Sequence, residues 1–366
     1  MNILILTGKF GMGHYSASQS LRQQLLRAFP EAVVAVEDFV AYAMPNGCEA
    51  MYKGFNLLVT HGSSLFNTYY KLTENAPADA RPPFEGIFLE KLDELLSERR
   101  PDAVIATHPL CAQLMTRWKW ESGQTLPLIT CVTDLSVHSE WINSGTDCYL
   151  VGSPDIRERL CGKGVERERI CVTGIPVKAE FKLPKRRRPR EGARNLLIMG
   201  GGLGLLPRKD KFYEELNSLP GVETTLIAGN NAKLRERLAG RYEHIKVLGY
   251  TDRVYDYMAR ADLMLSKPGG ITLFETIFSE LPMLAWEPFL QQEKNNARFL
   301  TRAGIGRIAS KEPEACLAAI RGLIYNDEAL ERMAQNMRRL KDELEEESLN
   351  RIVAAIGKAA GKEVCA

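Results

Sequence analysis

Short apolar runs alternate with longer amphipathic segments along the whole chain. In the first half, residues 15–29 and 84–98 carry apolar side chains at three- and four-residue steps, the periodicity of an amphipathic helix. Alternation of strands with such helices predicts βαβ units and a parallel sheet covered on both faces. The runs predicted as strands in this half are residues 3–7, 32–36, 103–107, 128–133 and 148–151.

The second half begins the same pattern afresh, so the chain is predicted to hold two doubly wound α/β domains. Residues 181–194, between the halves, contain two prolines, a glycine and seven basic residues, which is typical of a linker. The second set of predicted strands is residues 196–199, 223–227, 245–248, 263–265 and 283–285. The predicted organisation is a first domain over 1–176, a basic linker over 177–194, a second domain over 195–345 and a helical tail over 346–366.

Residues 39–74 interrupt the alternation with a long segment rich in aromatic side chains. One interpretation is a pair of helices that cover one edge of the first sheet. The other is an apolar surface that meets lipid. The two interpretations remain open at this point.

Composition narrows the classes of function. A chain of 366 residues with 45% apolar and 26% charged residues suits two globular domains, and a net charge of +2 does not suit a binder of nucleic acid. The eight cysteines include no C-x-x-C pair, so reduced thiols in the cytosol are expected. Since no run approaches the roughly 18–20 apolar residues of a spanning helix, we expect a cytoplasmic protein that can lie on the membrane without crossing it.

Candidate chemistry in the first half gathers at the ends of predicted strands, where open α/β sheets bind ligands. Gly11-Met-Gly13-His14 follows the first strand and opens a helix. His108 ends the next clear strand, and Asp134, His138 and Trp141 follow the one after it. The histidines suit a general base or a neighbour of phosphate better than a metal site, because no H-x-H or H-x-x-x-H spacing occurs. A helix-capping role for His14 is the alternative.

In the second half, a glycine-rich turn and a strand-to-helix segment stand out. Residues 199–204 include Gly201 and Gly202, whose backbone can approach a ligand closely. Residues 266–276 follow a strand, and free N–H groups at the start of the next helix suit a diphosphate. Glu275, one turn in, suits two ribose hydroxyls, with a capping box formed with Thr272 as the alternative. Residues 288–296 cluster amides and a carboxylate that suit sugar hydroxyls, with a polar capping loop as the alternative.

In this order and spacing, the motifs resemble a family within glycosyltransferase family 28, that of monogalactosyldiacylglycerol synthases and bacterial processive diacylglycerol glucosyltransferases. The resemblance covers nearly the whole chain. It implies a GT-B fold, in which two Rossmann-like domains face each other across a cleft, with acceptor in the first and donor in the second. It also implies an inverting, metal-independent displacement. The matching motifs are Gly11-x-Gly-His14, Thr107-His-Pro109, Thr133-Asp134 with His138 and Trp141, Val172-Thr-Gly-Ile-Pro176, Gly200-Gly-Gly-x-Gly204, Lys267-Pro-Gly-Gly270 through Glu275, and Gln292-Glu293.

The resemblance also implies roles for single residues. His14 is the candidate general base, and Glu275 the candidate partner of the uridine ribose. The implied acceptor side or cleft further includes Gly13, His108, Asp134, His138 and Trp141. Gly269, Gly270 and Ile271 are implied to offer N–H groups to the diphosphate, and Gln292 and Glu293 to bind the donor sugar. The implied donor side further includes Gly201 and Gly202.

The implied reaction uses UDP-glucose or UDP-galactose as donor, a diacylglycerol-type lipid as acceptor, and neither a metal nor another cofactor. The chain departs from the family pattern at residues 290–293, Leu-Gln-Gln-Glu in place of Pro-Gly-Gln-Glu, and at Ala17-Ser18 in place of Ala-Ala. The first departure leaves the donor sugar open. The basic cluster at residues 185–188, with residues 39–74, is expected to hold the protein on anionic lipid. Rival readings are another lipid-linked or soluble acceptor, a UDP-sugar 2-epimerase, and a nucleotide-sugar sensor without turnover.

Overall fold

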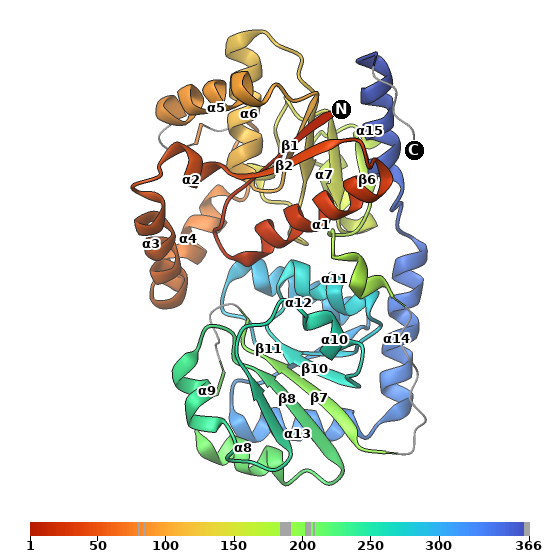
Figure 1. The fold of residues 1–366 in the computed structure, drawn as a ribbon. Helices are drawn as coiled ribbons and strands as arrows, with labels where there is room; N and C mark the ends of the chain where they lie inside the picture. The colour runs from red at the N-terminus through yellow and green to blue at the C-terminus, as the bar shows by residue number, and fades with distance from the viewer. Residues whose placement is uncertain (80, 83–84, 184–191, 202–205, 208, 362–366) are drawn as a thin grey trace. The chain divides into compact units, whose positions relative to one another are not determined.

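The computed structural model describes residues 1–79, 81–82, 85–183, 192–201, 206–207 and 209–361 (Figure 1). The chain divides into two compact units. Unit 1 comprises Met1–Ala179, Leu290–Gln292 and Leu344–Ala366, and unit 2 comprises Glu180–Phe289 and Glu293–Glu343. The basic cluster predicted at residues 185–188 lies outside the described residues.

Unit 1 is built on a six-stranded parallel sheet with the order β2-β1-β3-β4-β5-β6. The order reverses beside β1, because the chain moves first to β2 on one side and then to β3 on the other. A reversal of this kind leaves a crevice beyond the carboxyl ends of the strands, where ligands bind. The strands are β1 (Asn2–Thr7), β2 (Val33–Asp38), β3 (Ala103–Ala106), β4 (Leu128–Cys131), β5 (Cys148–Val151) and β6 (Ile170–Val172).

Both faces of this sheet are covered, and the alternation of side chains along β1 shows how. Leu4 and Leu6 point into one core, while Ile3 and Ile5 point into the other. The first core is completed by α2 (Phe39–Ala43), α5 (Glu85–Arg99) and α6 (Pro109–Ser122). The second is completed by α1 (Met12–Ala28) and by α15 (Ser348–Ala359), which brings the end of the chain back to unit 1. Unit 1 also contains α7 (Pro154–Cys161).

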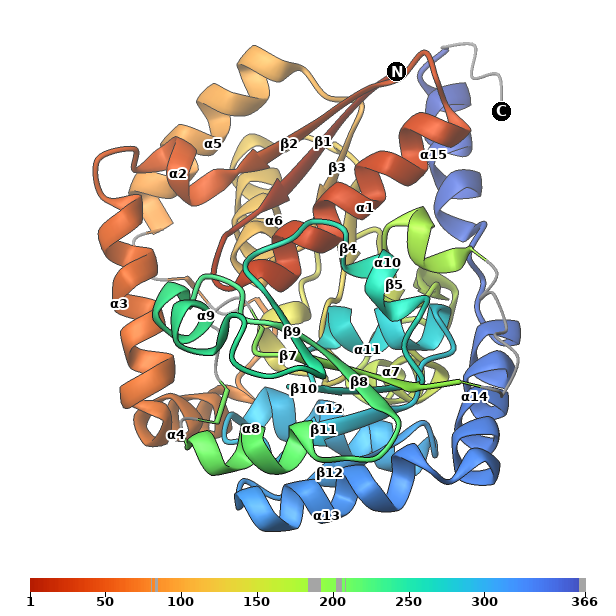
Figure 2. The same cartoon turned by 60° about the horizontal axis from the view of Figure 1, so that its bottom comes forward.

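Unit 2 repeats the plan with the order β12-β11-β10-β7-β8-β9, so its reversal lies between β7 and β10. On one face of this sheet α8 and α13 pack side by side in a common core (Figure 2). The strands are β7 (Arg194–Met199), β8 (Val222–Ile227), β9 (Ile245–Leu248), β10 (Leu263–Ser266), β11 (Met283–Trp286) and β12 (Gly306–Ala309). The helices are α8 (Asp210–Asn217), α9 (Ala232–Leu238), α10 (Val254–Met258), α11 (Gly270–Phe278), α12 (Gln291–Arg302), α13 (Pro313–Ile324) and α14 (Asp327–Asp342).

The prediction of two doubly wound parallel sheets is confirmed, and each of the ten predicted strands is present. The strands β6 and β12 were not predicted. The first has only three residues, and the second contains a glycine and an exposed arginine, so neither gives the continuous apolar signal of a buried strand. Sheet pairing at an edge stabilises both of them.

Residues 39–74 form three helices, α2, α3 (Cys48–His61) and α4 (Ser63–Thr73), where two were expected. Only α2 enters the core: α3 has no buried residue, and α4 has one, Tyr70. Figure 1 shows α3 and α4 beside α2, away from the strands of unit 1. None of the helices in the described ranges has the length and apolar character needed to cross a bilayer.

Candidate functional site

In unit 1, β1 and the glycines after it place His14 at the reversal of the sheet. Gly11 has a φ of +82°, a conformation that favours glycine, and α1 begins at the next residue. His14 therefore lies in the first turn of α1, with Gly13 beside it. Its ring Nδ1 lies 2.9 Å from the carbonyl oxygen of Thr107 and 2.7 Å from Thr133 Oγ1. The ring thus contacts the ends of two strands, β3 and β4, and does not cap the helix, so the capping alternative is wrong.

These contacts fix the tautomer of His14. A carbonyl oxygen only accepts hydrogen bonds, so Nδ1 must carry the proton that is donated to Thr107. In neutral imidazole the other nitrogen, Nε2, then has a free lone pair, and within the described part of the chain no hydrogen bond engages it. His14 is therefore held in the form that can take a proton from a substrate hydroxyl.

Hydroxyl groups beneath the ring support this placement. Thr107 Oγ1 lies 2.8 Å from Ser18 Oγ and 2.9 Å from Thr7 Oγ1, and all three residues are buried. Ser18, which departs from the family pattern, thus helps to fix the strand end that holds His14. Sequence reasoning missed the supporting roles of Thr107 and Thr133; the only signal was that each precedes a predicted site residue.

Burial and the neighbouring carboxyl group act on His14 in opposite directions. Burial lowers the pKa of His14 below 6.5, against the raising effects of the Asp134 charge and of the Thr107 carbonyl. Burial raises the pKa of Asp134, against the lowering effects of His14 and of a hydrogen bond from Trp141. An ionised Asp134 would stabilise the imidazolium that forms when His14 accepts a proton.

His108 packs against His14 with its ring edge to face, at a centroid distance of 4.7 Å and an interplanar angle of 73°. Its Nδ1 accepts the backbone N–H of Leu110 at 3.2 Å and so caps α6. Burial, and then the proximity of His14, hold the pKa of His108 well below 6.5. His108 is therefore neutral and carries its proton on Nε2.

His138 and Trp141 contribute to the shape of the same region. His138 Nδ1 accepts the N–H of Glu140 at 3.3 Å, and Nε2 lies 3.1 Å from the Tyr70 carbonyl oxygen, which leaves neither nitrogen for a substrate. His138 therefore ties α4 to this loop. The Trp141 ring, which is buried, lies 6.2 Å from that of His14.

Aromatic side chains lead from the histidines to α3 and α4. The ring of Phe10 lies 5.1 Å from His108 and 5.2 Å from Phe55 of α3. Phe55 in turn lies 6.0 Å from Phe66 of α4. The His14 region is thus continuous with an apolar path toward the two helices that bury almost none of their residues.

In unit 2, two glycine-containing turns lie at the reversal of the sheet. Gly201 follows β7 with a φ of +66°. A Cβ at this position would lie 3.0 Å from Cε of Lys267, so the lysine side chain runs directly over the glycine. Gly202, the other glycine predicted for this turn, lies outside the described residues.

The second turn, after β10, leads into α11. Gly269 is the N-cap residue, and no side chain caps the helix, so the capping box of Thr272 and Glu275 does not form. The N–H of Gly269 donates to the carbonyl oxygen of Lys267 at 2.9 Å, which leaves those of Gly270 and Ile271 in the first turn. An uncapped helix start without an acidic residue in its first turn favours an anionic ligand.

Helix α12 presents polar groups to this turn. The buried carboxylate of Glu293 lies 3.1 Å from Lys267 Nζ, and Asn296 donates from Nδ2 to the Pro268 carbonyl oxygen at 3.0 Å. Gln292 lies half-buried at the start of α12, and Glu275 half-buried in α11. Sequence reasoning assigned no separate role to Lys267 or Asn296.

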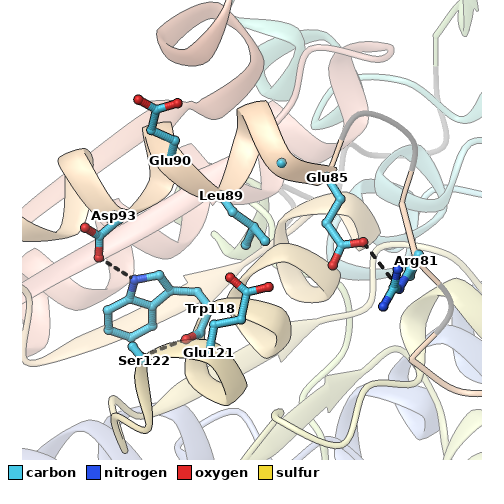
Figure 3. A pocket seen from close by; sticks show the side chains of 9 residues that line it. Arg81, Glu85, Leu89, Glu90, Asp93, Trp118, Glu121 and Ser122 are labelled. Carbon is cyan, nitrogen blue, oxygen red and sulfur yellow. Dashed lines mark hydrogen bonds and ion pairs between the residues drawn. The ribbon is translucent and has the colours of Figure 1, made fainter.

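A pocket of about 700 Å³ lies elsewhere in unit 1, between α5 and α6 (Figure 3). The side chains of Glu85, Glu90, Asp93 and Glu121 line it, and Trp118 donates from its indole nitrogen to Asp93 at 2.8 Å. None of the predicted site residues lines this pocket. Across the described ranges, no group of three or more His, Cys, Asp or Glu side chains is placed to hold a metal ion.

Comparisons with known proteins show which family the chain resembles. The model for monogalactosyldiacylglycerol synthase matches residues 14–177, and that for the glycosyltransferase family 28 C-terminal domain matches residues 196–349. Processive diacylglycerol beta-glucosyltransferases from Staphylococcus carnosus (strain TM300) and Bacillus subtilis (strain 168) are 29% and 27% identical to this chain. The alignments cover 93% and 92% of it, and 88% and 91% of those proteins.

Among solved structures, the glycotransferase of kitacinnamycin is similar, with a TM-score of 0.66 over 97% of this chain and 98% of that chain. At 16% identity this likeness shows the fold alone, two Rossmann-like domains of the GT-B type. With both domains matched by family models, the chain belongs to glycosyltransferase family 28, in the branch whose first domain is that of the monogalactosyldiacylglycerol synthases.

Proposed function

We propose that this chain transfers a hexose, with inversion, from a UDP-sugar to diacylglycerol or a related membrane lipid. The observation that carries the proposal is the geometry of His14, whose bond to the Thr107 carbonyl leaves Nε2 ready to accept a proton. Family membership supplies the reaction class. Because the relatives are named beta-glucosyltransferases, UDP-glucose is the first donor to test and UDP-galactose the second.

In the proposed reaction, His14 Nε2 removes the proton of the acceptor hydroxyl while that oxygen attacks the anomeric carbon. The bond from this carbon to the diphosphate breaks on the opposite face, and UDP leaves with the bonding electrons. Asp134 stabilises the imidazolium, and the start of α11 opposes the charge that grows on the diphosphate. This account requires neither a metal nor another cofactor.

The membrane forms part of the proposal, because α4 carries an exposed apolar stripe. Leu65, Tyr69 and Leu72 follow one another at helical spacing and are 68%, 51% and 77% exposed, and Leu57 of α3 is 62% exposed. An exposed stripe of this kind fits the apolar boundary of a lipid surface. The aromatic path from Phe66 to His108 then offers an apolar route for the acceptor toward His14.

Replacement of Leu57, Leu65 and Leu72 together by serine tests this docking. We expect binding to vesicles of anionic lipid to fall at least about tenfold, since a buried leucine side chain contributes about 1.5–3 kcal/mol. Cosedimentation with vesicles gives the measurement. Val33→Ser is the control, because Val33 is equally exposed, at 63%, but lies on β2. Unchanged binding of the triple variant would show that α3 and α4 do not contact the membrane.

The activity is tested with UDP-glucose and UDP-galactose, diacylglycerol in mixed vesicles, and EDTA throughout. We expect glycolipid to form and UDP to be released. This result would identify the donor sugar and, because EDTA is present, show that the reaction needs no metal. Release of UDP without glycolipid would indicate another acceptor. If UDP is not released, UDP-N-acetylglucosamine with a search for its 2-epimer tests the epimerase, and donor binding without turnover would indicate a sensor.

A further inference from the structure

Lys267 stands where the two ligand-facing turns of unit 2 meet. It is the first residue after β10, and its side chain runs over Gly201 at the end of β7. Because β7 and β10 are the neighbours between which the strand order reverses, its ammonium group lies at the position where doubly wound sheets bind ligands.

The ion pair between Lys267 and Glu293 is asymmetric in its exposure. The side chain of Glu293 is 6% exposed, whereas that of Lys267 is 42% exposed. The carboxylate is therefore enclosed by protein, while the lysine side chain is partly open to a ligand. An ammonium group has three N–H donors, and Glu293 Oε1 occupies one of them.

Helix α12 fixes this arrangement at two points. Glu293 and Asn296 are three residues apart and so lie on the same helix face. The first anchors the Lys267 side chain, and the second holds the carbonyl oxygen of Pro268, the next residue along the turn. The lysine is thus held in place at the turn that leads to the N–H groups of Gly270 and Ile271.

We infer that Lys267 binds the diphosphate of the donor, with Glu293 as the residue that positions it. The inference deepens the proposed function and rests on it, because it takes a UDP-sugar as the ligand. With the N–H groups at the start of α11, the lysine supplies the positive charge that a departing diphosphate needs. In this role Glu293 acts through Lys267, and its predicted contact with the donor sugar stays a separate prediction.

The test compares the binding of UDP with that of uridine, by isothermal titration calorimetry on the full chain. Lys267→Met keeps most of the apolar stem over Gly201 and removes the charge. Since this substitution leaves a buried carboxylate unpaired, the double variant Lys267→Met/Glu293→Gln is measured beside it to preserve folding. Lys294→Ala, which alters an exposed lysine of the same helix, is the control.

For both Lys267 variants we expect the Kd of UDP to rise about 10- to 100-fold, with the Kd of uridine unchanged. Lys267→Arg is expected to recover part of the loss, and Lys294→Ala to bind as the unsubstituted protein does. A double variant that binds UDP with unchanged Kd would overturn the inference, as would equal weakening of UDP and uridine. If the unsubstituted protein itself binds no UDP, the proposed function fails instead.

Discussion

The reversal points of the two sheets have the same topology and carry different chemistry. In unit 1, the strand ends hold a crowded group of neutral rings and hydroxyls around His14, with Asp134 as the acidic neighbour. In unit 2, they hold glycine turns, the uncapped start of α11 and a lysine. The first arrangement suits movement of a proton, and the second suits a fixed anion. Topology therefore gives the place of each site, and the few residues after each strand give its chemistry.

The largest expected effect comes from removal of the candidate base in unit 1, which should change turnover but not UDP binding. For His14→Ala we expect kcat to fall by about 10²–10⁴, the usual contribution of a general base, with UDP affinity unchanged because UDP is assigned to unit 2. Turnover with UDP-glucose and calorimetry with UDP give the two values. His244→Ala, which alters a histidine on the surface of unit 2, is the control. Near-normal turnover of His14→Ala would exclude His14 as the base.

The converse change removes the ribose partner in unit 2. For Glu275→Ala we expect the KM for the UDP-sugar to rise about 10- to 100-fold, because a carboxylate that accepts hydroxyl hydrogen bonds contributes about 1.5–3 kcal/mol. The change in kcat is expected to be smaller. Glu314→Ala, in an exposed part of α13, serves as the control. A loss confined to kcat would contradict the assignment of Glu275 to the nucleoside.

Two glycines of unit 2 with positive φ differ in their surroundings. Gly201 and Gly240 have φ values of +66° and +68°, but only Gly201 lies against another side chain, that of Lys267. Alanine at either position should lower the free energy of unfolding by about 1 kcal/mol through backbone strain. Only Gly201→Ala should weaken UDP binding, because its Cβ displaces the lysine. Thermal denaturation and calorimetry test both expectations, and an equal effect of the two variants on UDP would contradict the second.

The smallest expected effect concerns the acid limb of the pH profile. The base must be deprotonated, and burial lowers the pKa of His14, so kcat/KM should persist as the pH falls to 6.5 and decline only below that value. Asp134→Asn removes a charge that raises this pKa, so its acid limb should lie at still lower pH. Rates measured between pH 5 and pH 8 test both statements. A limb with its midpoint above 6.5 would contradict the effect of burial on His14.

The local pattern of the sequence determined the strands, the doubly wound class and the strand ends that carry polar residues, because continuous apolar runs mark strands buried on both faces. It did not determine that the last helix, α15, packs on unit 1, because an amphipathic helix can bury its face against any apolar surface. Nor did it separate His108 and His138, whose ring nitrogens accept backbone N–H groups, from His14, whose Nδ1 is held by the Thr107 carbonyl.

Only the tertiary structure decided which atoms meet. The Thr107 carbonyl that fixes the tautomer of His14 comes from 93 residues further along the chain, and Lys267 meets Gly201 across two strands that are neighbours in the sheet but not in sequence. Parallel strands next to each other in a sheet are joined by crossovers of a dozen residues or more. Contacts between their ends therefore leave no local pattern in the sequence, and they arise only when the sheet assembles.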